Sequence, residues 1–174
     1  MITILIFLCF SLGEDNKYLT AYDYVRHDSL ASKFLLGQTL STDSSAIQVS
    51  DSIVYIDALF FLDELIAIRH GQIRDVNRLR QIKQETYVKE FEYRKAFKGY
   101  RSKELKTLNT LGPKRLVLYF SEVRDDILFG ELFRYSGQKS LHELRTFNES
   151  VQYLFHFGEG GKIEHVFSKK MAYN

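Results

Sequence analysis

Residues 114–135 read KRLVLYFSEVRDDILFGELFRY, and this stretch decides the fold. Leu116, Leu118 and Phe120 alternate with residues of the opposite face, which is the period of two expected for a β-strand. The polar run Arg124-Asp125-Asp126 then interrupts the apolar pattern, as a tight turn between two strands would. The stretch therefore predicts a β-hairpin with strands over residues 114–123 and 127–135.

A second stretch of the same kind ends the chain. Residues 151–157 (VQYLFHF) and 162–171 flank the turn-like run Gly158-Glu159-Gly160-Gly161. Val151, Tyr153 and Phe155 share one face, which should be the core side, and His156 should point away from it. Two hairpins predict four antiparallel strands, and a segment over residues 47–55 could add a fifth.

The chain ahead of the hairpins has helical patterns instead. Helices are predicted over residues 18–36, 57–70 and 73–98, with Asp57 as an N-cap and Gly37 and Gly71 as stops. In the third helix the apolar residues step by three, so their stripe drifts around the axis and a bend or break is expected near residues 84–86.

These patterns predict an α+β domain over residues 14–174, with a helical part at about 17–110 and a β part at about 113–174. N-terminal helices should pack on one face of a mostly antiparallel sheet of four to five strands. A curved, cone-like sheet of the cystatin or nuclear-transport-factor type is compatible with this order, although no motif carries that analogy. The 174 residues, 45% hydrophobic and 26% charged, fit one globular domain.

The first twelve residues, MITILIFLCFSL, carry no charged side chain. With small residues at Ser11 and Gly13, residues 1–13 resemble a secretory signal peptide cut before Glu14, although no Lys or Arg precedes the run. The run is shorter than the roughly 20 residues of a membrane span. Two alternatives are acylation at Cys9, which Leu8 disfavours, and a buried first element of a cytoplasmic domain. The leading expectation is a periplasmic or secreted protein.

The net charge of +2 conceals two blocks of opposite sign. Residues 14–68 hold 3 basic and 9 acidic side chains, whereas residues 69–106 hold 12 basic and 5 acidic ones. The favoured interpretation is that the two blocks face each other in the fold. Otherwise the basic block is a surface for an anionic partner, with candidate contacts at Arg74, Arg78, Arg80 and Lys83.

Four polar residues of the hairpins are candidates for chemistry. His156 and His165 lie on the two arms of the second hairpin, and they could form a ligand pocket or a weak metal site if they are cross-strand neighbours. Glu122 and Glu131 of the first hairpin could act as an acid–base pair. The favoured interpretation of the histidines is two exposed strand residues. For the glutamates it is a solvated strand face or cross-strand pairing with Arg or Lys.

No nucleophile elbow, phosphate loop, metal-ligand spacing or nucleic-acid motif occurs in the sequence. We therefore predict a non-catalytic binding protein without cofactor or metal, whose partner could be a protein or a small ligand. One alternative is a small hydrolase or isomerase with a pocket between helices and sheet. The other is an anionic-surface binder that uses residues 69–106.

Overall fold

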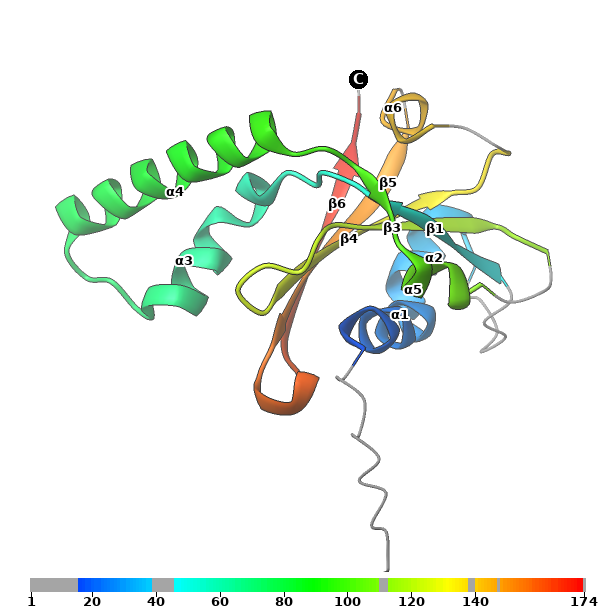
Figure 1. The fold of residues 1–174 in the computed structure, drawn as a ribbon, viewed down its shortest axis with the longest axis horizontal. Coiled ribbons are helices and arrows are strands. Elements are labelled where there is room, and N and C mark those ends of the chain that lie inside the picture. The colour runs from blue at the N-terminus through cyan, green and yellow to red at the C-terminus, as the bar shows by residue number, and fades with distance from the viewer. Residues whose placement is uncertain (1–15, 39–45, 110–112, 138–139, 147, 174) are drawn as a thin grey trace, which may run out of the picture.

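A six-stranded, mostly antiparallel sheet with the strand order β2-β1-β3-β4-β5-β6 forms the centre of the protein (Figure 1). The computed structural model describes residues 16–38, 46–109, 113–137, 140–146 and 148–173. Within these residues, only β1 and β3 pair in parallel. The strands are β1 (Ile47–Ile53), β2 (Tyr100–Arg101), β3 (Leu116–Phe120), β4 (Ile127–Arg134), β5 (Glu149–Phe157) and β6 (Ile163–Ala172).

Helices precede the hairpins, and the α+β class and mostly antiparallel sheet are confirmed. The segment near residue 47 is the strand β1, which was the possible fifth strand, and the sheet exceeds the expected four to five strands because the two-residue strand β2 pairs with it. The helical segments are α1 (Lys17–His27), α2 (Ser29–Leu36), η2 (Ala58–Phe61), α3 (Leu62–His70), α4 (Val76–Ala96), α5 (Lys103–Thr107), α6 (Leu141–Leu144) and η3 (Glu159–Gly161).

Helices cover both faces of the sheet, whereas packing on one face was expected. Helices α1, α2 and α5 pack on the face that carries Phe120, Tyr153 and Phe155. On the opposite face, Phe61 of η2 and residues of α3 pack against side chains of the strands, among them Phe129 of β4. Strands β3 and β4 bury nearly every residue, so both of their faces need a cover. The one-face expectation therefore holds for α1, α2 and α5 but not for η2 and α3.

The helix predicted over residues 18–36 is broken at Asp28. Asp28 has an extended backbone, and its carboxylate accepts hydrogen bonds from the backbone N–H groups of Leu30 (3.0 Å) and Ala31 (3.3 Å). It therefore caps a second helix, α2, which ends at Gly37 in the left-handed conformation as predicted. The Tyr153 hydroxyl donates to the same carboxylate at 2.8 Å, which ties the break to the sheet.

The expected break near residues 84–86 is wrong, because α4 is continuous over 21 residues. Its buried positions are Ile82, Thr86 and Glu90, which step by four and form a straight stripe. Glu90 can occupy this stripe because Arg124 pairs with its carboxylate at 2.9 Å. Periodicity of apolar residues alone could not reveal a stripe that includes a charged side chain.

The turn between β3 and β4 is the tight turn that the sequence predicts. Asp125 and Asp126 have φ values of 50° and 61°, the left-handed pair of a two-residue hairpin loop. Arg124 and Ile127 close this loop with two backbone hydrogen bonds. The helix stops at Gly71 and the N-cap at Asp57 are also as predicted.

The acidic and basic blocks meet at two described ion pairs. Lys83 of α4 pairs with Asp63 of α3 at 2.7 Å, and Arg101 pairs with Asp51 at 3.5 Å. Other charges of both blocks pair with the C-terminal part of the chain instead, as Arg69 does with Asp125. The blocks therefore face each other in part. None of the helices in the described ranges combines the length and apolar character needed to cross a bilayer.

Candidate functional site

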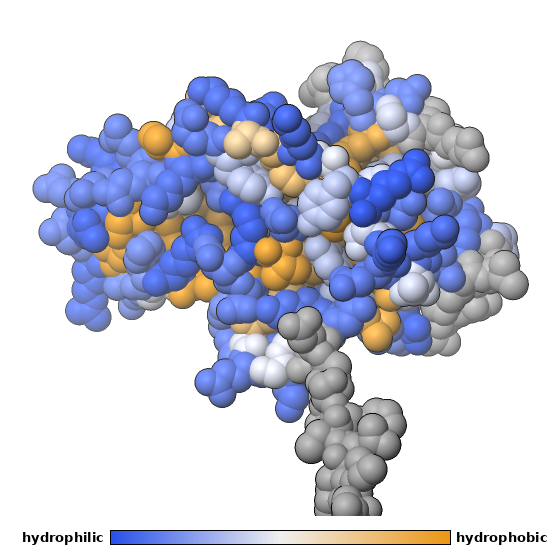
Figure 2. Space-filling view, viewed as in Figure 1, coloured by the Kyte–Doolittle hydropathy of each residue, from blue (hydrophilic) through white to orange (hydrophobic). Residues whose placement is uncertain are grey.

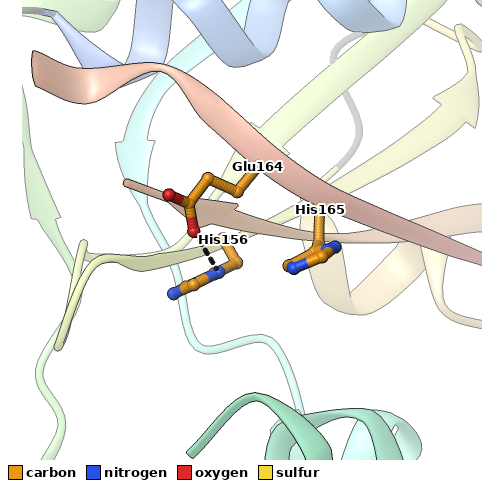
Figure 3. A group of neighbouring side chains, drawn as sticks. All are labelled: His156, Glu164 and His165. Atoms are coloured by element: carbon orange, nitrogen blue, oxygen red, sulfur yellow. Dashed lines mark ion pairs between the residues drawn. The ribbon is translucent and has the colours of Figure 1, made fainter. Parts of the chain in front are cut away.

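His156 and His165 are cross-strand neighbours near the end of the second hairpin (Figure 3). Their rings are nearly parallel, at an interplanar angle of 7°, and their centroids lie 5.7 Å apart. His156 is opposite Ile127 of β4, on the face away from Tyr153 and Phe155, as the alternation predicts. The His165 residue is exposed, and the His156 side chain is only 21% exposed.

Glu164 joins the two histidines, although the alternation of the strand does not predict it. Simple alternation places Glu164 on the opposite face from His165. The register shifts between His156 and Phe157, however, so the strand has an irregularity at this point. As a result a Glu164 carboxylate oxygen lies 3.5 Å from Nδ1 of His156 (Figure 3). The three side chains form one cluster, with ligand atoms within 4.8 Å of one another.

Glu131 is fully buried, whereas a solvated or cross-strand-paired carboxylate was expected. Its carboxylate pairs with the Arg145 guanidinium and accepts hydrogen bonds from the hydroxyls of Ser150 (2.8 Å) and Tyr173. Arg145 also donates to the carbonyl of Tyr55 at 3.3 Å. Burial, together with the Glu131 charge, raises the pKa of Tyr173 to about 12, so its hydroxyl stays protonated as a donor. Through these contacts, Glu131 of the sheet is linked to the C-terminal end of α6, to Tyr173 and to Tyr55, which follows β1.

Glu122 takes part in a different group, beside the C-terminal end of α4. It accepts hydrogen bonds from the hydroxyls of Tyr93 (3.2 Å) and Tyr100 (3.3 Å). Burial raises the pKa of Tyr93 to about 12, and the nearby Glu122 charge acts in the same direction. Glu122 and Glu131 therefore have separate sets of partners and do not form an acid–base pair.

The four candidates for chemistry do not converge on one site. Glu131 and His156 share a face of the sheet, but four residues separate them along it, which is about 13 Å at 3.3 Å per residue. A cavity of about 560 Å³ does lie on this face, between the sheet and α6. It is lined by Gln48, Ser50, Arg101, Lys106, Val117, Tyr119 and others, but by none of the four candidates.

The basic candidates lie just before and within the first part of α4, at the far end of an arm that α3 and α4 form (Figure 1). Arg74, Arg78 and Arg80 are exposed, and Arg78 donates to the side chain of Gln81 at 3.2 Å. Lys83 pairs with Asp63 of α3 at 2.7 Å. Two of the four basic candidates therefore already have partners within the protein.

The outer face of α4 exposes large apolar side chains to solvent. Tyr87, Val88 and Phe91 are 53%, 51% and 44% exposed, and the rings of Tyr87 and Phe91 stack 6.4 Å apart. The ammonium of Lys95 lies 4.1 Å from the centre of the Phe91 ring. The arm extends away from α1 and α2 (Figure 1), and in the view of Figure 2 its apolar atoms appear mostly between the two helices, with hydrophilic ones along its edges.

No protein-family model, curated protein or solved structure matches the chain.

Proposed function

We propose that this protein is a non-catalytic binding protein that contacts an acidic protein partner through the outer face of α4. The observation that supports it is the adjacent exposure of Tyr87, Val88 and Phe91 on a projecting helix. When large apolar side chains form an exposed cluster, that cluster often marks a site of interaction with another molecule. We call this surface the α4 face, made of these three residues with Arg80 and Lys95.

The composition of the α4 face supports a protein partner. Tyrosine, phenylalanine and arginine are enriched in the buried centres of protein interfaces. Stacked rings on a continuous helix are also held in place before binding, which reduces the entropy lost on association.

The charge of α4 supports an acidic partner. The helix has six Lys and Arg residues but only three Glu, and one of these, Glu90, is buried against Arg124. A second copy of the chain would bring like charges together across such an interface. A surface with acidic residues around an apolar centre would complement it instead.

Photo-crosslinking in an extract of the protein's own cells tests this proposal. A photoreactive residue at Val88 should give a defined protein adduct, whereas one at the exposed loop residue Glu159 should not. The double change Arg80→Glu/Lys95→Glu should reduce the adduct at least about tenfold, because reversing two charges at an interface costs more than about 1.4 kcal/mol.

Three outcomes would contradict the proposal. Equal labelling from both positions would mean non-specific capture, and an adduct with a second copy would mean self-association. An adduct that survives the charge reversal would exclude an acidic partner. If the anionic-surface alternative is right, the protein should sediment with phosphatidylglycerol vesicles in a salt-sensitive way. The double variant should lose this binding.

The proposal includes export of the protein. The apolar run before Glu14 supports it, although residues 1–15 lie outside the described residues. The mature protein should begin at Glu14 and therefore lack Cys9, the sole cysteine. Intact-mass and N-terminal analysis of native protein measures this directly, and a chain that still begins at Met1 would refute export.

A further inference from the structure

We propose that His156, Glu164 and His165 form a binding site for one divalent transition-metal ion, with Zn²⁺ as the best fit. Two imidazoles and one carboxylate are a ligand set that binds zinc in proteins. They come from neighbouring positions on β5 and β6, so the backbone hydrogen bonds of one hairpin hold all three. This inference is independent of the α4 face.

The distances suit a metal site after small side-chain rotations. One ligand atom from each residue lies within 4.8 Å of the others. In a tetrahedral zinc site with bonds of about 2.0–2.2 Å, ligand atoms lie about 3.3 Å apart. The Glu164 side chain is 52% exposed and the His165 residue is exposed, so both can rotate to close the difference without disturbing the core.

The irregularity in the strand and Gly158 together determine where the Glu164 carboxylate lies. The shift in register brings Glu164 to the side of the histidines. Gly158 leaves space for its side chain, because a Cβ at position 158 would lie 2.0 Å from a Glu164 carboxylate oxygen and 2.4 Å from its carboxyl carbon. The loop that joins the two strands therefore shapes the position of the third ligand.

The surroundings leave His156 available as a ligand. Its Nδ1 atom is buried and makes no hydrogen bond with any described residue, which is an unfavourable state that a bound cation would relieve. Lys17, the single lysine of α1, pairs with Asp126 at 2.5 Å, so its charge is partly neutralised. Three protein ligands leave a fourth position for water or for an atom from another molecule.

Calorimetric titration of the full chain with Zn²⁺ tests the site. We expect one ion per chain. His165→Ala and Glu164→Gln should each weaken binding at least about tenfold, in the range seen when groups that support a metal site are lost. The control His142→Ala, on α6, should leave binding unchanged. Both ligand positions are at the surface, so the variants should keep the far-ultraviolet circular dichroism of the parent.

Gly158→Ala is the sharper variant because it removes no ligand. It should displace the Glu164 carboxylate and weaken Zn²⁺ binding about tenfold. Co²⁺ in place of Zn²⁺ should give visible absorption bands of a tetrahedral site, lost in His165→Ala. Absence of saturable binding at 1:1 stoichiometry, or binding that His165→Ala leaves unchanged, would overturn the proposal.

Discussion

Replacing Glu131 by alanine should lower the free energy of unfolding by about 3–5 kcal/mol, the usual cost of removing one partner from a buried ion pair. The Glu131 side chain is 0% exposed, and its carboxylate has Arg145, Ser150 and Tyr173 as partners. The change would leave Arg145, whose side chain is only 24% exposed, without its counter-ion. Urea denaturation followed by circular dichroism measures the loss.

Glu122→Ala is the matched control, because Glu122 also accepts two hydrogen bonds in the same hairpin region. It is partly exposed, so water can replace its tyrosine partners and the loss should stay below about 1 kcal/mol. Equal losses for the two variants would show that the Glu131 group is not the buried anchor described above.

Replacing Phe61 by alanine should cost about 3–5 kcal/mol, as expected for a large cavity in a core. Phe61 is fully buried, and its ring centre lies 6.0 Å from that of Phe129 on β4. Because η2 leads directly into α3, the cavity would open where the arm joins the sheet. Amide hydrogen exchange should therefore accelerate in α3 and α4 before it does in β3–β5.

The neighbouring residue Phe60 supplies the control. It is 43% exposed, so Phe60→Ala should cost less than about 1 kcal/mol and leave exchange in the arm unchanged. If the two variants were equally stable, the arm would not depend on the packing of Phe61 against the sheet.

Much of the fold could be predicted because it depends on local patterns. The alternation around Leu118 and Tyr153 marks the hairpin strands, and the Asp125-Asp126 turn marks where they reverse. The missed features depend on contacts between distant segments. The Asp28 carboxylate at the break also accepts a hydrogen bond from Tyr153, more than a hundred residues away, and Glu90 is buried on α4 because it pairs with Arg124.

The candidate site also has features that the sequence could predict and features that it could not. The histidine pair could be predicted as cross-strand neighbours because hairpin geometry relates positions on either side of a turn. The position of Glu164 could not, because a one-residue shift in register has no signal in the sequence period. The exposure of the α4 face could not be predicted either, because Tyr87 and Phe91 are as apolar as core residues.

The sequence alone was enough to place the four hairpin strands and the main helical segments, the two turns and the aromatic face of β5. These properties follow from side-chain period and turn chemistry, which act over a few residues. Only the tertiary structure decided which polar groups are buried, which apolar groups are exposed and which ligands meet. Burial is a property of the assembled layers, so Glu131 and Phe91 take environments that their residue types do not predict.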